Sequence, residues 1–274
     1  MTIEPFRAGD SAAFLEMAAA EGWLAEAWEL DFLLAVFPEG CLCMRDSDGN
    51  PIAFVTSLHH ERSGWIGNLI VATEFRGQGI GEALFRKALQ ALHAAGAGTV
   101  WLTASNAGRP LYEKYGFKSL DTVVRWSGTG RRRHPGHDRH ADSSEPSASL
   151  SYIDFQAWGD RRDALLAATA GRGRLLRGES GFLVVQPCGA GSQLGPFSAL
   201  DSSTAAWLYD AALGSVPQGT RIYSDAPLSN RAAVRLFSRR GMQVTGSTLL
   251  MYAGDRPDYR PGLLYGLATM GSCG

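Results

Sequence analysis

The sequence predicts an α+β protein built from two similar domains, each a mixed sheet flanked by helices, with a polar linker between them. The chain has 274 residues, which is more than one ordinary hydrophobic core serves. Residues 127–149 are rich in Gly, Ser, Pro and Arg and lack any apolar period. Strand-like and helix-like patterns alternate on both sides of that segment. We therefore expect domains over residues 1–128 and 149–274 and a linker over residues 129–148.

The first domain is expected to alternate helices and strands around one long amphipathic helix. In that helix apolar residues keep i, i+4, i+7 spacing from Ile80 until Gly96 ends it. Period-2 patterns and turn signals such as Ser47-Asp48-Gly49-Asn50-Pro51 mark the strands. The other expected elements are helices at residues 10–20, 26–37 and 109–115 and strands at residues 41–45, 52–59, 65–73, 99–103 and 117–126.

The second domain is predicted to repeat this order. Its expected elements are strands at residues 182–186, 221–224 and 247–252 and helices at residues 204–213 and 231–240. The segment Leu111-Tyr112-Glu113-Lys114-Tyr115-Gly116-Phe117 is echoed 125 positions later by Leu236-Phe237-Ser238-Arg239-Arg240-Gly241-Met242. We interpret the echo as two copies of one fold; a chance match of two helix-ending segments is the alternative.

Composition narrows the class of protein. A net charge of −1 argues against a nucleic-acid or membrane-surface protein. No apolar run is long enough to cross a bilayer and the first ten residues do not resemble a signal peptide, so we expect a cytoplasmic protein. The cysteines at 41, 43, 188 and 273 are interpreted as free thiols, without a metal role. The linker's Arg131 to Arg133, His134, His137 and His140 are interpreted as solvated side chains rather than a metal or phosphate site.

A glycine-rich turn between a predicted strand and helix is typical of an anion site. Arg76-Gly77-Gln78-Gly79-Ile80-Gly81 allows close approach of the backbone, aims N–H groups at one spot and adds a guanidinium. The G-x-G-x-G spacing does not fit a Rossmann dinucleotide site. A Walker loop is also excluded, because the turn does not end in Gly-Lys-Ser/Thr. A tight turn without a ligand is the remaining alternative.

Two segments together resemble the signature of GNAT N-acetyltransferases. They are Val71-Ala72-Thr73-Glu74-Phe75-Arg76-Gly77-Gln78-Gly79-Ile80-Gly81 and Leu111-Tyr112-Glu113-Lys114-Tyr115-Gly116-Phe117. The resemblance covers residues 1–128. The second half is similar to the companion domain of certain bacterial two-domain members, through Trp158-Gly159-Asp160-Arg161, residues 195–201 and Met251-Tyr252-Ala253-Gly254.

The resemblance implies acetyl-CoA as co-substrate, held in the first domain. It implies that Arg76, Gly77, Gln78, Gly79, Ile80 and Gly81 bind the pyrophosphate, that the backbone of Leu69, Ile70 and Val71 binds pantetheine and the acetyl carbonyl, and that Asn106 contacts the cofactor. The chain departs from the family pattern at Thr73, where many members have proline, and around Asn106.

The resemblance also implies an acid and leaves the base open. Tyr112 matches a tyrosine near the CoA sulfur, and a phenol with a pKa near ~10 can protonate a leaving thiolate. His59, His60 and Glu61, expected at a central cleft, and Glu74 are the candidate bases. At the offset of 125, the residue that corresponds to Arg76 is Asp201, and the one that corresponds to Tyr112 is Phe237. The three glycines of the turn correspond to Ser202, Thr204 and Ala206. We therefore expect only the first domain to bind CoA.

The acceptor is expected near the first two helices. There carboxylates alternate with indoles, a pattern suited to a cationic amine; the alternative is an amphipathic helix with a wet acidic face. The residues concerned are Glu21, Trp23, Glu26, Trp28, Glu29 and Asp31. The predicted function is direct acetyl transfer from acetyl-CoA to the amine of a small molecule, without a metal. A non-catalytic acyl-CoA-binding module and an enzyme acting on protein lysines or N-termini are the alternatives.

Overall fold

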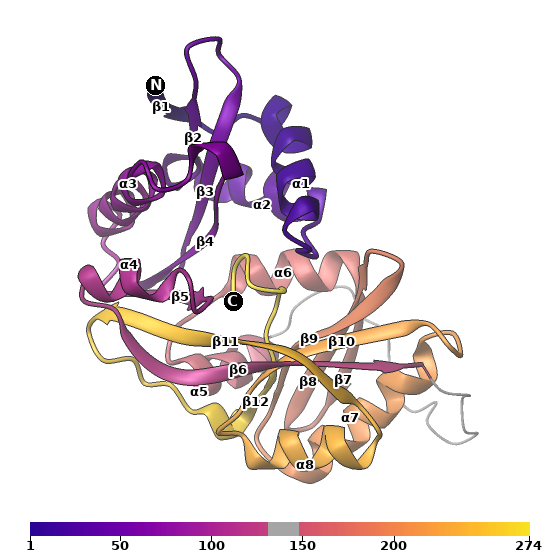
Figure 1. The fold of residues 1–274 in the computed structure, drawn as a ribbon. Helices are drawn as coiled ribbons and strands as arrows, with labels where there is room; N and C mark the ends of the chain where they lie inside the picture. Colours follow the sequence, from indigo (N-terminus) through magenta and orange to yellow (C-terminus); the bar gives the residue numbers. More distant parts are fainter. Residues whose placement is uncertain (131–147) are drawn as a thin grey trace.

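The computed structural model describes residues 1–130 and 148–274. Nearly all of the predicted linker, including its arginine and histidine cluster, lies outside the described residues. Figure 1 shows two lobes, one formed by the start of the chain and the other by the second half, with the C-terminus lying between them.

The N-terminal half contains the predicted elements and one further strand at its start. Its strands are β1 (Thr2–Pro5), β2 (Leu42–Arg45), β3 (Pro51–His59), β4 (Ser63–Val71), β5 (Thr99–Ala104) and β6 (Lys118–Thr129). Its helices are α1 (Ser11–Ala20), α2 (Ala27–Val36), α3 (Ile80–Ala94) and α4 (Arg109–Lys114), with short 3-10 turns η1 (Ala8–Asp10), η2 (Pro38–Gly40) and η3 (Thr73–Phe75).

The C-terminal half repeats this order with a shorter start and an added end. Its strands are β7 (Arg174–Gly178), β8 (Gly181–Cys188), β9 (Gly191–Ala199), β10 (Arg221–Pro227), β11 (Gln243–Gly254) and β12 (Leu264–Gly266). Its helices are α5 (Ala148–Trp158), α6 (Asp163–Arg172), α7 (Ser202–Ser215) and α8 (Arg231–Arg239), with η4 (Pro261–Leu263) before β12.

The described strands join into one mixed sheet that runs through both halves. Its order is β1-β2-β3-β4-β5-β11-β6-β10-β9-β8-β7, with β12 paired to β9. The pairs β4/β5 and β9/β10 are parallel, and the other neighbours are antiparallel. Each half therefore has a mixed sheet flanked by helices, as the sequence predicts.

The two halves exchange their last strands at the centre of this sheet. β11 pairs with β5 of the first half, and β6 pairs with β10 of the second half. β6 and β11 also pair with each other along most of their lengths and run side by side across Figure 1. The inner edge of each half is therefore covered by a strand of the other half.

Helices cover the sheet and bury separate apolar clusters. α3 packs its predicted apolar stripe, including Leu84, Phe85 and Leu92, on the strands of the first half. α7 does the same in the second half with Leu208 and Tyr209. Between the halves, the rings of Trp65 and Trp101 on adjacent strands both pack edge-on against Trp158 of α5, at 6.2 and 5.6 Å.

Several helices and strands were not predicted from the sequence. β9 contains Gly191, Gly195 and Pro196, which interrupt the alternation expected of a strand. β1, β7 and β12 have only three to five residues each, too few for a periodic signal. α5 and α6 were also missed, in the segment that follows the predicted linker.

The C-terminal segment enters the first half. After β12 it crosses to β4, where the Trp65 indole donates a hydrogen bond to the Gly271 carbonyl (3.2 Å). A Cβ on Gly67 would lie 2.3 Å from the Ser272 carbonyl oxygen, so only glycine allows this approach. Residues from the end of the chain thus become part of the first half.

Candidate functional site

The parallel strands β4 and β5 separate partway along their lengths. They pair only where Ser63–Trp65 face Thr99–Trp101, and β4 continues to Val71 without a register partner in β5. The pairing of β4 with β3 also shifts near Asn68, whose φ of 55° is unusual for a residue other than glycine. The bulge and the loss of pairing leave main-chain groups of β4 facing the gap between the strands.

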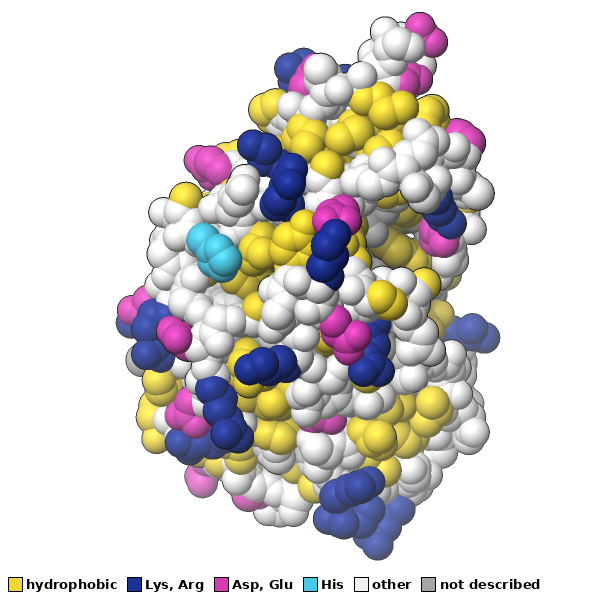
Figure 2. Space-filling model, turned by 60° about the vertical axis from the view of Figure 1, so that its left-hand side comes forward, with side chains coloured by type: hydrophobic (Ala, Val, Ile, Leu, Met, Phe, Trp, Pro, Cys, Tyr) yellow, Lys and Arg dark blue, Asp and Glu magenta, His cyan; other side chains and the backbone are white. Residues whose placement is uncertain are grey.

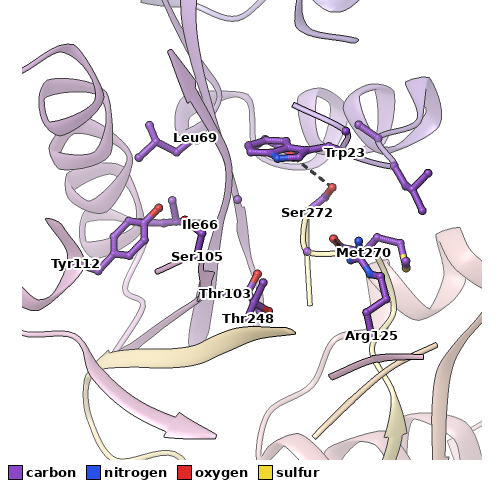
Figure 3. Close-up of a pocket in the computed structure, with 16 residues that line it drawn as sticks. Trp23, Ile66, Leu69, Thr103, Ser105, Tyr112, Arg125, Thr248, Met270 and Ser272 are labelled. Carbon is purple, nitrogen blue, oxygen red and sulfur yellow. Dashed lines mark hydrogen bonds between the residues drawn. The ribbon is translucent and has the colours of Figure 1, made fainter. Parts of the chain in front are cut away.

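A cavity of about 220 Å³ lies in this gap. It is lined by residues from the α1–α2 loop, from β4, β5, α4, β6 and β11, and from the C-terminal segment: Gly22, Trp23, Leu24, Ala25, Ile66, Gly67, Asn68, Leu69, Thr103, Ser105, Tyr112, Arg125, Thr248, Met270, Gly271 and Ser272. Figure 3 shows Tyr112 and Ser105 on one side and Ser272, Met270 and Arg125 on the other. Both halves of the chain therefore build the cavity wall.

Arg125 is fixed at the base of this cavity. Its guanidinium donates two hydrogen bonds to Asp225 on β10 (2.9 and 2.7 Å) and a third to the Met270 carbonyl (3.1 Å). Because β6 pairs with β10, this bidentate ion pair follows directly from the strand exchange. It holds the C-terminal segment against the sheet.

The predicted anion-binding turn lies between β4 and α3. Gly77 and Gly79 have φ values of 76° and 78°, and no atom lies within 4 Å of the position that a Cβ would take on either. Gly79 is the residue immediately before α3, whose first N–H groups have no partner within the helix. The turn is therefore an open cradle of backbone donors at the positive end of a helix.

Arg76 is in the turn but its guanidinium is engaged. It donates to the Val71 carbonyl (2.9 Å) and to Glu21 in the α1–α2 loop (2.5 Å). Both side chains of this ion pair are more than a third exposed, and such pairs contribute ~0–1 kcal/mol. An anion of higher charge can compete with Glu21 for Arg76.

Tyr112 lines the cavity, but its pKa is not that of a free phenol. Its ring packs on Phe85 of α3 (5.1 Å between centroids) and near Phe117 (6.2 Å). Burial raises the pKa of Tyr112 to about 12. The sequence-based expectation of an unperturbed phenol is corrected: Tyr112 holds its proton more tightly and remains a donor at any physiological pH.

Most of the predicted base candidates lie elsewhere. His59 ends β3, His60 and Glu61 lie in the turn between β3 and β4, and none of the three lines the cavity. Their turn instead contacts the second half, where the Glu61 amide donates to the Arg161 carbonyl (3.4 Å). Burial, together with the nearby Arg162, lowers the pKa of His60 to about 3. The expectation that this turn reaches the central cleft is therefore corrected, and Glu74 lies exposed in η3.

The predicted acceptor wall is divided in the structure. Trp23 lines the cavity, whereas Asp31 is exposed on α2 outside it. Trp28 stacks on the Arg172 guanidinium of α6 (4.3 Å), which also pairs with Glu26 (2.9 Å). The indole and carboxylate do hold a cation, but that cation belongs to the second half of the protein.

Glu29, which the sequence analysis named only as one carboxylate of the acceptor wall, has a different position in the structure. It is buried on α2, and burial raises the pKa of its carboxyl to about 7. Ser272, in the cavity wall, donates a hydrogen bond to it. Helical spacing could have indicated this position, because Glu29 lies one turn before the buried Leu33 and beside the buried Leu30.

The remaining predicted cofactor residues, apart from Asn106, lie at the end of β4, in the turn that follows it and at the start of α3. Leu69 lines the cavity, Ile70 and Val71 end β4, Ile80 and Gly81 begin α3, and Gln78 donates to the Glu74 carbonyl (3.4 Å). Asn106 lies in an exposed turn between β5 and α4 and does not line the cavity. Its contact with the cofactor stays a prediction.

In the second half, the positions that correspond to the open turn and to the unpaired end of β4 are occupied by other parts of the chain. Only residues 200 and 201 connect β9 to α7, whereas residues 72–79 connect β4 to α3. Asp201 caps α7 by accepting from the Thr204 amide (2.8 Å). β12 pairs with β9 at Phe197 and Ser198, the stretch of β9 that corresponds to the free end of β4.

This geometry corrects the sequence alignment of the two halves. When the starts of α3 and α7 are aligned, Asp201 corresponds to Gly79, and Arg76 has no counterpart in the shorter connection. The offset of 125 applies only farther along, where Phe237 packs on Tyr209 (5.1 Å) as Tyr112 packs on Phe85 (5.1 Å). The two halves differ by a missing loop as well as by substitutions.

The described residues contain no group of three or more His, Cys, Asp or Glu side chains placed to hold a metal ion. Within residues 1–130 and 148–274, no helix has the length and apolar character to cross a membrane. Figure 2 shows one face on which Lys and Arg side chains are interspersed with Asp and Glu.

Comparisons with protein families identify both halves. Residues 10–117 match the model of the acetyltransferase (GNAT) family, and residues 151–266 match a second model described as an acetyltransferase (GNAT) domain. Together the matches span most of the chain. A sequence comparison with curated proteins gave no match.

Solved structures share the whole architecture. A proposed acetyltransferase of Pyrococcus horikoshii, 23% identical, aligns over 100% of this chain and 95% of its own with a TM-score of 0.87. GCN5-related N-acetyltransferases of Sphaerobacter thermophilus (17% identical, 97% and 98% of the two chains, TM-score 0.62) and Kribbella flavida (18%, 92% and 71%, 0.58) are also similar. At these identities the likeness establishes the fold.

Proposed function

The protein belongs to the GNAT acetyltransferase family, and from this premise we propose that its N-terminal half binds acetyl-CoA and transfers the acetyl group to the amine of a small molecule. The observation that carries the proposal is the path that one stretch of chain follows, from Leu69 in the cavity wall, along the unpaired end of β4, to the open turn at Gly77 and Gly79.

The residues along this path fit the parts of acetyl-CoA. The turn offers amides and the N-terminus of α3 to a pyrophosphate, and its glycines leave room for close approach. Arg76 would exchange the Glu21 carboxylate for phosphate oxygens. The main chain of Leu69 to Val71 has no strand partner on the β5 side and can pair with the amides of the pantetheine arm. When bound, the thioester supplies an activated acetyl group.

Two tasks then fall to the protein's own groups. Main-chain N–H groups near the bulge at Asn68 would stabilise negative charge on the carbonyl oxygen. Tyr112 would donate its phenolic proton to the departing sulfur, since its raised pKa keeps it protonated before transfer. The same raised pKa makes it a reluctant donor, so its donation is coupled to departure of the sulfur.

The size of the cavity supports a small acceptor. A volume of about 220 Å³ is below the ~300–1,000 Å³ of sites that enclose drug-sized ligands. Its wall is closed by the α1–α2 loop and by the C-terminal segment, which would obstruct a folded protein. Its polar groups, including Ser105, Thr103 and Arg125, suit a polar amine rather than an apolar one.

The proposal is tested with the full-length protein, acetyl-CoA and a panel of small amines, amino acids and lysine peptides. We expect micromolar heat-detected binding of CoA and thiol release that depends on a small amine. Release only with peptides would assign a protein acceptor instead. Tight CoA binding without release for any amine would favour a non-catalytic acyl-CoA-binding module, and no CoA binding would remove the proposal altogether.

A further inference from the structure

Four polar side chains form a buried chain that ends in the cavity wall. Ser272 Oγ lies within hydrogen-bonding distance of both Glu29 Oε2 and Asn68 Oδ1, the latter at 3.2 Å. Asn68 donates from Nδ2 to Thr56 Oγ1 (3.0 Å), which donates to the Gly67 carbonyl (3.4 Å). Ser272 and Asn68 line the cavity, whereas Glu29 lies behind them.

The hydrogens of this chain can be assigned. Because the Thr56 hydroxyl donates to a carbonyl, Thr56 must accept from Asn68 Nδ2, and Asn68 Oδ1 therefore faces Ser272 as an acceptor. Ser272 has one hydroxyl hydrogen for two acceptors, Oδ1 and the Glu29 carboxylate. If Glu29 takes up a proton, it can donate to Ser272, which then donates to Asn68, and every member is satisfied.

We propose that Glu29 is the terminal proton acceptor of the transfer reaction and acts through Ser272, which contacts the acceptor amine. This inference rests on the function proposed above. It assigns the base to two elements that are far apart in the sequence, α2 and the C-terminal segment, so that the second half supplies a group to the reaction centre of the first.

One proton of the acceptor ammonium passes to Ser272 Oγ while the Ser272 hydroxyl proton passes to Glu29. The neutral amine then forms the C–N bond to the acetyl carbon, the C–S bond breaks, and the sulfur takes a proton from Tyr112. The second proton lost by nitrogen restores Tyr112 through solvent. After product leaves, Glu29 returns its proton along the same route, so one proton is released per acetylated ammonium.

The surroundings of Glu29 favour this exchange. Burial is the main cause that raises its pKa to about 7; the hydrogen bond from Ser272 lowers the pKa, Glu26 raises it and Arg172 lowers it. The thiols of Cys188 and Cys273, which also face Glu29, have raised pKa values and are neutral at that pH. Glu29 is thus poised between its two forms near neutrality.

The test compares the pH dependence of turnover in the wild type, Glu29→Gln and Ser272→Ala, using the amine that the panel identifies. We expect the wild-type rate to fall as the pH drops through about 7, because protonated Glu29 cannot accept. Both variants should lose ~10²-fold in kcat and lose this acid limb, with CoA affinity unchanged. The double variant should be no slower than either single variant, since the two residues act in series.

Glu16→Gln, an exposed carboxyl on the neighbouring α1, is the matched control and should keep both rate and limb. The relay is overturned if Glu29→Gln keeps the acid limb, or if the losses of the two single variants multiply in the double variant. A merely structural role for Glu29 would change stability without removing a titration from the rate.

A readout without substrate guards against misfolded variants. In ¹³C NMR of the full-length protein, one glutamate carboxyl should titrate near neutral pH, be absent in Glu29→Gln and move in Ser272→Ala. If no carboxyl titrates between about pH 6 and 8, the relay is wrong. If the wild type acetylates no amine but this titration is present, the proposed function fails separately.

Discussion

The two halves of the chain share one order of elements but differ at the three places where a ligand could enter. In the first half β4 has a free end, a long turn precedes α3, and glycines leave space above that turn. In the second half β12 covers β9, two residues precede α7, and Asp201 fills the helix N-terminus. The comparison shows that the same fold leaves room for a ligand in the first half and is closed to one in the second half.

The halves also treat buried carboxylates differently. Asp154 on α5 is fully buried and forms a bidentate ion pair with the buried Arg162 (2.8 Å for both contacts). Glu29 on α2 is equally inaccessible but has a hydroxyl, Ser272, as its direct partner. A permanent ion pair fixes a charge, whereas a hydroxyl allows a proton to come and go.

The largest expected effect comes from installing the cap of the second half in the first. Gly79→Asp places a carboxylate where the pyrophosphate is proposed to bind, and two unit charges 4 Å apart near a surface repel by about 4 kcal/mol. We expect CoA affinity to fall by at least ~100-fold by calorimetry. Gly79→Ala is the control for the strain of a side chain at a φ of 78° and should cost about tenfold. Equal losses in both variants would mean that charge is irrelevant there.

The second prediction concerns how the free energy of unfolding depends on pH through Glu29, the buried carboxyl that has, among the described residues, no ion-pair partner in direct contact. The folded chain keeps the Glu29 proton up to about pH 7, whereas the unfolded chain releases it near 4.5. The free energy of unfolding should therefore fall by ~3 kcal/mol as the pH rises through this interval, relative to Glu29→Gln. Urea unfolding of both proteins at a series of pH values measures the difference. Parallel profiles for the two proteins would contradict the raised pKa.

The third prediction tests the aromatic pair that the halves share. Tyr112→Phe gives the first half the residue that the second half has at Phe237, and keeps the packing on Phe85. We expect kcat to fall by ~10²-fold because the sulfur loses its proton donor, with CoA affinity within about twofold of the wild type. Steady-state kinetics and calorimetry measure the two quantities. Unchanged turnover would make Tyr112 a packing residue.

The smallest effect is expected from opening the closed half. Asp201→Ala removes the N-cap of α7 and should cost ~1 kcal/mol of stability, seen as a lower melting temperature. It should not create a second CoA site, since β12 still covers β9. Calorimetry that showed a second equivalent of CoA bound by this variant would mean that the cap alone closes the second half.

The sequence predicted what depends on local pattern. The glycine turn and the amphipathic α3 follow from spacing within short windows, and the structure has both at the predicted positions. The role of Tyr112 came from the family resemblance and stays a prediction. The fold class also followed from the order of elements. The pairing of β11 with β5 could not be predicted in this way, because it joins segments more than a hundred residues apart.

The site residues missed by sequence reasoning depend on such distant pairing. Ser272 and Arg125 reach the cavity only because the C-terminal segment and β6 cross between the halves. Glu29 looked like one member of an acidic surface, and its burial follows from contact with that same segment. Conversely, Trp28 had the predicted chemistry but was already paired with a cation of the protein, Arg172.

The strand exchange also limits when the protein can mature during synthesis. β5 receives its neighbour only when β11, residues Gln243–Gly254, has left the ribosome, and the cavity wall is completed later still by Ser272. A nascent chain that ends before this point has an exposed strand edge and an incomplete cavity wall. The cavity wall is therefore complete only after residues 243–272 have been made, however early the glycine turn forms.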